Sequence, residues 1–165
     1  MSRSSRFGDE RMRIREAKLA DIARLAEIRA GDTEAGPADL RMERYLAGTH
    51  HPGDALAPRV MYVALEGDHI AGYIAGHLTT RFDCRGELQY LYVARGYRRR
   101  GAASALLMAL TNWFIEQDAR RVCVDVVPEN AAARSFYRQS GAVELNRAWM
   151  VWEDIGLGAR ANAGV

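Results

Sequence analysis

The segment between Glu87 and Leu107 contains the residue types that could bind a phosphate group. Its apolar part ends at Val93, an arginine-rich bend follows, and small residues begin a helical pattern at Gly101. The first N–H groups of a helix lack internal partners and lie at the positive end of its dipole, so small residues there let an anion approach closely. Arg98–Arg100 add positive charge. The bend has neither the GK[ST] ending of a P-loop nor the GxGxxG of a dinucleotide fold, so a solvated arginine cluster is the alternative.

Cysteine and histidine residues do not fall at the spacing of a metal site or a disulfide framework. Cys84 and Cys123 lie far apart without a CxxC pair, which predicts two reduced thiols. His50 and His51 lie in a loop that contains glycine and proline, with no further ligands at metal spacing, which predicts surface histidines. We therefore expect no metal ion.

Hydrophobic periodicity predicts strands and helices on both sides of the arginine-rich bend. Apolar residues at helical spacing in Ala102–Asp118 indicate a helix that lies on a sheet, and the nearly continuous apolar run Val122–Val127 indicates a central strand. Gly67-Asp68 has the length and composition of a hairpin turn between antiparallel strands. The other expected elements are a strand near 11–15, helices over 18–30 and 38–47, a loop over 49–58, strands over 60–66, 70–80 and 87–93, a helix up to 140 capped by Asn130, and one or two strands within 143–155.

The composition is that of one folded domain. The 165 residues are 48% hydrophobic and 27% charged, which disfavours disorder, collagen-like repeats and coiled coils. The net charge of +2, from 23 basic and 21 acidic residues, is too balanced to indicate a nucleic-acid binder. No apolar run has the length of a membrane span. We expect a soluble, cytoplasmic α/β (α+β) protein with a loose tail at 1–10, a domain at 11–156 and a C-terminal tail at 157–165.

Two blocks of sequence resemble the GNAT superfamily of acyl-CoA-dependent N-acetyltransferases. The first is RRRGAA at 98–103, which is similar to the family signature Q/R-x-x-G-x-G/A. The second is Asn130-x-x-Ala133-x-x-Phe136-Tyr137, followed by Gly141-Ala142. The first block departs from the commonest pattern because alanine, not glycine, is its last residue. The resemblance covers 60–155 and implies one GNAT-like domain, with a mixed, mostly antiparallel sheet of six or seven strands flanked by four helices.

The resemblance implies acetyl-CoA as the cofactor, with CoA as the product. In the family the pantetheine arm lies between the fourth and fifth strands, bound to backbone groups of the fourth strand, and the pyrophosphate is bound by the loop that follows. Asn130 resembles a cofactor-contacting asparagine of the family, and helix capping explains it equally well. Carried over to this sequence, the cofactor-binding residues are Leu91, Tyr92, Val93, Arg98, Arg99, Arg100, Gly101, Ala102, Ala103, Ser104 and Asn130.

The resemblance also implies two catalytic residues, because acyl transfer to an amine requires two proton movements. An alkyl ammonium is almost entirely protonated at pH 7, so its proton must be removed. Glu87 aligns with the general-base glutamate of several members, and the alternative is an exposed strand-end acid paired with Arg81 or Arg85. Tyr137 occupies the position of the general acid that protonates the leaving thiolate, and the alternative is a core tyrosine. Asp125 is either a second carboxylate near the amine or a paired acid of the core.

The expected function is transfer of an acetyl group from acetyl-CoA to a primary amine by direct attack. One rival is a non-catalytic CoA or acyl-CoA sensor on the same fold, which would not need Glu87 and Tyr137. A second is a nucleic-acid-binding module that uses Arg95–Arg100, which the balanced charge disfavours. The acceptor is a small-molecule or protein amine. We expect no nucleic-acid or membrane partner, and since family members often dimerise, the resemblance implies a homodimer.

Overall fold

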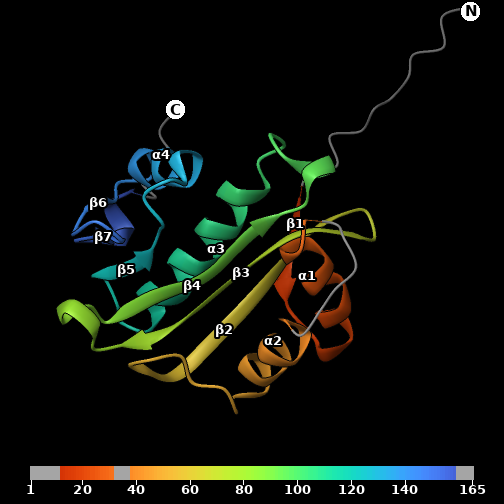
Figure 1. Cartoon of the computed structure of the whole chain (residues 1–165), viewed down its shortest axis with the longest axis horizontal. Helices are drawn as coiled ribbons and strands as arrows, with labels where there is room; N and C mark the ends of the chain where they lie inside the picture. The colour runs from red at the N-terminus through yellow and green to blue at the C-terminus, as the bar shows by residue number, and fades with distance from the viewer. Residues whose placement is uncertain (1–11, 32–37, 159–165) are drawn as a thin grey trace, which may run out of the picture.

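The computed structural model describes residues 12–31 and 38–158, which contain one seven-stranded sheet (Figure 1). The strands are β1 Arg13–Glu16, β2 Ala55–Glu66, β3 His69–Thr79, β4 Gly86–Val93, β5 Val122–Asp125, β6 Val143–Glu144 and β7 Trp149–Trp152. Their order across the sheet is β1-β2-β3-β4-β5-β7-β6. All neighbours are antiparallel except β4 and β5, which are parallel. The mixed, mostly antiparallel sheet expected from the sequence is confirmed.

Helices connect the strands. The four α-helices are α1 Ile22–Arg29, α2 Ala38–Ala47, α3 Ala102–Glu116 and α4 Ala131–Gln139, and residues 155–158 are also helical. Short 3₁₀ turns occupy η1 Leu19–Asp21, η2 Arg81–Asp83 and η3 Arg95–Tyr97. The four helices predicted from the sequence are therefore present. No helix within the described residues has the length and apolar character needed to cross a bilayer.

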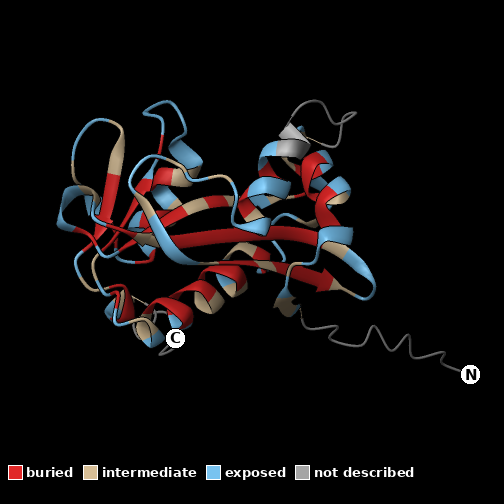
Figure 2. Cartoon of the chain, turned by 90° about the horizontal axis from the view of Figure 1, so that it is seen from below, coloured by how far each residue is buried: buried red, intermediate tan, exposed pale blue. Residues whose placement is uncertain are grey.

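The sheet separates two apolar cores, and helices cover both of its faces (Figure 2). One core joins α1 and α2 to one face of the sheet, where Met42 and Tyr45 pack with Tyr73 and Tyr90. The other core joins α3 and α4 to the opposite face. Residues two apart on a regular strand share a face. A β-bulge between Leu88 and Tyr90 reverses this, so β4 contributes Leu88 to the second core and Tyr90 to the first. Residues of β4 can therefore meet groups from all four helices.

Glycines end the first two helices as the sequence predicts. Gly31 and Gly48 both have φ of +79°, which a residue without a side chain adopts at low cost. The predicted hairpin is also present, since Glu66 pairs with His69 across Gly67-Asp68. Two predictions need correction. The expected helix at 18–30 has a 3₁₀ first turn, and β2 begins at Ala55, inside the segment expected to be a loop.

Candidate active site

A cleft opens where β4 separates from β5. The two strands pair only from Gly86↔Val122 to Leu88↔Val124, although β4 continues to Val93. The change in direction coincides with a β-bulge: Gly76 of β3 pairs with Leu88 and Ala75 with Tyr90, so Gln89 is an extra residue. Beyond the bulge, the edge of β4 that faces away from β3 has no strand partner within residues 12–31 and 38–158. Its backbone N–H and C=O groups are available to a ligand, and the cleft has a volume of about 450 Å³.

Glu87 lies at the closed end of this cleft and is buried, with 4% of its surface exposed. Its Oε2 atom lies 3.2 Å from Nε2 of His77, the residue directly opposite on β3, and 3.5 Å from Nε of Arg81. Nδ1 of His77 lies 2.9 Å from the hydroxyl of Tyr45, which comes from α2. Glu87 is therefore held by three elements. It contacts Arg81, as the alternative interpretation required, but it is not the exposed acid that this interpretation assumed.

Tyr137 reaches the same cleft from α4. Its ring packs against Phe136 and edge-on against Trp152, at centroid distances of 5.6 and 5.5 Å. Burial raises the pKa of Tyr137 above its ordinary value, so its phenol stays protonated at neutral pH. Asn130, before α4, accepts a hydrogen bond from the N–H of Ala133 at 3.1 Å and also lines the cleft. The predicted capping role of Asn130 is thus confirmed.

The arginine-rich bend connects β4 to α3. The N–H groups of Ala102–Ser104 lie in the first turn of α3, so they have no acceptor within the helix. Gly101 precedes the helix with φ of +84° and has no side chain with which to cap it. Arg98, Arg99 and Arg100 are all exposed around this turn. Nη1 of Arg100 is bound to Glu66 at 2.6 Å, so its charge is already paired. Backbone amides and the other two arginines therefore remain for an anion.

The structure brings together only part of the predicted site. Glu87, Leu91, Tyr92, Asn130 and Tyr137 line the cleft. Val93 and the turn at 98–103 are not among the residues that line it, and follow β4 toward α3. Asp125 also lines the cleft, but it is exposed, so the interpretation of Asp125 as a core acid is wrong.

Sequence reasoning missed three residues of this region: Tyr45, His77 and Arg29. His77 is fully buried and is the direct contact of Glu87 on β3. The pairing of the strands on either side of the 80–85 loop was the signal that could have identified it. Arg29 comes from α1 and Tyr45 from α2, and no spacing in the sequence connects either residue to Glu87. Within the described residues, no group of three or more His, Cys, Asp or Glu side chains could hold a metal ion.

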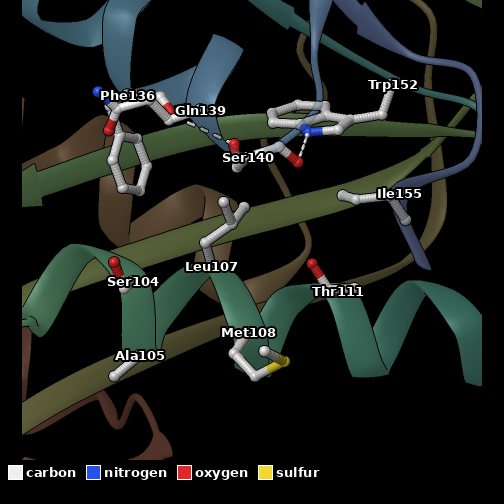
Figure 3. A pocket seen from close by; sticks show the side chains of 10 residues that line it. All are labelled: Ser104, Ala105, Leu107, Met108, Thr111, Phe136, Gln139, Ser140, Trp152 and Ile155. Carbon is white, nitrogen blue, oxygen red and sulfur yellow. Dashed lines mark hydrogen bonds between the residues drawn. The ribbon is translucent and has the colours of Figure 1, made fainter. Parts of the chain in front are cut away.

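A second groove of about 440 Å³ lies between α3 and α4 (Figure 3). Ser104, Leu107 and Thr111 of α3 face Phe136 and Ser140 across it. The carbonyl of Ser140 accepts a hydrogen bond from Nε1 of Trp152 at 3.1 Å, which holds the end of α4 against β7. None of the residues lining this groove titrates, so it offers no group for acid–base chemistry. The cleft between β4 and β5, which is lined by Glu87 and Tyr137, is therefore the candidate site for acid–base chemistry.

Comparison with known families agrees with this geometry. Residues 22–142 match the model of the acetyltransferase (GNAT) family, and this match spans most of the chain. The chain belongs to the GNAT acetyltransferase family. The matched region of this GNAT protein includes Glu87, the arginine-rich turn and Tyr137. A comparison with curated protein sequences finds no match.

Solved structures with the same fold include proteins bound to CoA compounds. A GNAT-family acetyltransferase from Staphylococcus aureus has a TM-score of 0.68 and 15% identity, covering 86% of this chain and 98% of its own. The PaiA N-acetyltransferase of Thermoplasma acidophilum, solved with coenzyme A, has a TM-score of 0.62 and 13% identity, with coverage of 86% and 97%. The Salmonella typhimurium protein YncA, solved with its cofactor acetyl-CoA, has a TM-score of 0.64 and 18% identity, with coverage of 86% and 90%. At these identities the likeness shows the fold.

Proposed function

We propose that this GNAT protein transfers the acetyl group of acetyl-CoA to a primary amine by direct attack. The observation that carries the proposal is that Glu87 and Tyr137, a buried carboxylate and a buried phenol from opposite faces of the sheet, line one cleft. The amine nitrogen would form its bond to the thioester carbonyl carbon while the carbon–sulfur bond breaks. One group must take a proton from the ammonium, and another must give one to the leaving sulfur.

The donor fits the chain's own features. Acetyl-CoA supplies the thioester, and the unpaired edge of β4 beyond Leu88 offers backbone groups to an amide-containing arm. The free N–H groups of Ala102–Ser104, together with Arg98 and Arg99, would bind the pyrophosphate. A backbone N–H of β4 would stabilise the negative charge that develops on the carbonyl oxygen.

Glu87 would accept the proton of the ammonium, directly or through a water molecule. Both His77 and Arg81 contact Oε2, and among the described residues no hydrogen bond or ion pair involves Oε1. Oε1 is therefore the oxygen that remains for the amine. His77 and Arg81 would hold the carboxylate at one position, which saves the entropy of orienting it in each turnover.

Tyr137 would give its phenolic proton to the departing thiolate. Its raised pKa keeps that proton in place at neutral pH, and its ring contacts with Phe136 and Trp152 fix its direction. The nitrogen loses two protons on its way from ammonium to amide. Glu87 would accept one and pass it to solvent, and the other would replace, through solvent, the proton that Tyr137 gives to the thiolate, so each turnover releases one proton.

Thiol release from acetyl-CoA in the presence of a panel of amines tests the proposal. We expect turnover with at least one amine, and a loss of kcat of about 10²-fold or more in the Glu87→Gln variant, with acetyl-CoA affinity retained. Full turnover in that variant would disprove the role of Glu87. Binding of acetyl-CoA without turnover of any amine would instead support the non-catalytic sensor.

A further inference from the structure

Arg29, the last residue of α1, lines the same cleft as Glu87. Its guanidinium lies over the ring of Tyr90, 5.3 Å from the ring centroid. Its Nη1 atom is buried and has no hydrogen-bond partner among the residues that the structure describes. Burying a charged donor without an acceptor is costly, so this atom is well suited to bind an acceptor oxygen that a ligand brings into the cleft.

The other arginine in the described lining of the cleft already has partners. Arg81 donates from Nη2 to the carbonyl of Gly53 at 2.6 Å and contacts Asp54 and Glu87 at 3.6 and 3.5 Å. Arg29 is therefore the one cation of that described lining without an anionic partner. Arg41, on α2, also acts on the hydroxyl of Tyr90, where it and Arg29 oppose the effect of burial on the pKa. Two positive charges therefore act on this end of the cleft.

A continuous set of contacts connects Arg29 to Glu87 on the α1–α2 face of the sheet. The ring of Tyr90 below Arg29 packs edge-on against Tyr45, with a centroid distance of 5.6 Å. Tyr45 binds His77, and His77 binds Glu87. Tyr137 of α4 belongs to the opposite face. A molecule that enters on the α1–α2 face therefore meets a carboxylate and an unpaired guanidinium in one cavity.

We propose that Arg29 binds a carboxylate of the acceptor, so that the acceptor is a primary amine that also carries a carboxylate, as in amino acids. This inference rests on the proposed function, because it assigns the amine end of the acceptor to Glu87. The planar guanidinium fits the two oxygens of a carboxylate, and the ring of Tyr90 holds it in place. A polyamine or another purely cationic acceptor would leave Arg29 unpaired and be repelled by it.

Matched pairs of acceptors test the assignment. The panel contains amino acids with the amine and carboxylate separated by one to five carbons, each beside its uncharged carboxamide, and α-amino acids with larger side chains beside theirs. We expect kcat/KM for at least one acid to exceed that of its amide by about tenfold or more, the effect of one charged hydrogen-bonded pair. Arg29→Gln should raise KM for the acid by a similar factor and leave the amide within about twofold. Arg29→Lys should retain part of the preference.

The control is Arg24→Gln, which makes the same change of charge in the same helix, at a residue paired with Glu27. It should keep the preference for the acid. The inference is overturned if amides or other uncharged amines are better acceptors than the acids, or if Arg29→Gln weakens both members of a pair equally. In those cases the acetyltransferase function stands. If neither the panel nor any other amine is acetylated, the proposed function fails and the assignment of Arg29 fails with it.

Discussion

Glu87 shows how neighbouring side chains define the environment of one carboxylate. A carboxylate at the start of a strand is usually solvated, but His77, Arg81 and the walls of the cleft surround this one. His77 and Arg81 both contact Oε2 of Glu87. In the proposed mechanism this leaves Oε1 to accept the proton of the amine. A side chain that holds Glu87 without touching the substrate should therefore affect turnover more than binding.

His77 is the residue on which this prediction bears. His77→Ala removes the hydrogen bond to Glu87 and leaves a cavity beside it, so kcat should fall about tenfold or more and the free energy of unfolding by about 2–4 kcal/mol. His77→Gln, whose amide nitrogen can donate from a similar position, should recover most of kcat. Steady-state kinetics and urea unfolding of both variants measure this. Equal kcat in the two variants would show that a hydrogen-bond donor at position 77 does not support turnover.

A substitution at Tyr137 should change kcat without changing the binding of acetyl-CoA. Tyr137→Phe removes the hydroxyl but keeps the ring contacts with Phe136 and Trp152. We expect kcat to fall about 10²-fold or more, with little change in the KM for acetyl-CoA or in the melting temperature. Since burial raises the pKa of Tyr137 above its usual value near 10, wild-type activity should not decline through its ionisation below about pH 10. An alkaline loss of activity near pH 8 that disappears in Tyr137→Phe would contradict this.

The sequence predicted the residues that lie in local motifs and missed those that depend on tertiary contact. Tyr137 belongs to a block in which Asn130 and Phe136 are also recognisable, so its place on α4 followed from a short pattern. His77 and Arg29 belong to no such block. Their roles depend on the register of β3 with β4 and on how α1 packs over Tyr90.

Helix α1 must be held in place for Arg29 to reach the cleft. Asp21, just before this helix, accepts two hydrogen bonds from Arg15 of β1, at 2.8 and 3.0 Å, and one from the N–H of Lys18 at 2.7 Å. The hydrogen bonds from Arg15 hold the start of α1 against the edge strand β1. Mainly through the hydrogen bonds from Arg15, the pKa of Asp21 lies below its usual value.

Asp21→Asn should therefore destabilise the protein in a pH-dependent way. At pH 7 we expect a loss of about 1.5–3 kcal/mol in the free energy of unfolding. Because the pKa is lowered on folding, this contribution is present above the unfolded pKa near 3.9 and disappears as the pH falls through the folded pKa. Urea unfolding at pH 7 and pH 3 should show a smaller difference between variant and wild type at pH 3. Glu27→Gln, in an exposed pair with Arg24, should cost less than about 1 kcal/mol, and a pH-independent effect of Asp21→Asn would refute the assignment.

Elements were predictable where the apolar pattern decides them. The stripe of α3 buries Leu106, Leu110 and Phe114, and its period alone indicates a helix on a sheet. The start of β2 was not predictable in this way. Ala55 pairs with Thr79 and Leu56 with Leu78, and a register shift before Arg59 separates these two pairs from the rest of β2. They lie within a segment whose proline and glycine residues indicate a loop. The bulge at Gln89, which opens the cleft, likewise depends on the partner strand.

At the scale of the whole molecule, the sheet and its four helices place the two proposed sites along one strand. β4 begins at the buried carboxylate and ends at the turn that precedes α3, so a ligand bound along it connects the anion site to the reaction centre. If CoA compounds bind along β4 in this way, their binding should stabilise the entire fold. A generic arginine patch would respond to any polyanion of similar charge.

The thermal shift with acetyl-CoA, CoA and ATP distinguishes these cases. At one hundred times its Kd a ligand stabilises the native state by about 2.7 kcal/mol, which for a domain of this size raises the melting temperature by roughly 5–11 °C. Both CoA compounds should produce this shift at concentrations where ATP produces little, because only they have an arm that reaches the free edge of β4. Arg98→Ala should reduce the shift without abolishing it, because backbone amides would provide most of the anion contacts in the proposed site. Arg120→Ala, at a residue paired with Asp154, should leave the shift unchanged. Equal shifts with ATP would mean that the turn binds anions without the cleft, and the role of the unpaired β4 edge would then be wrong.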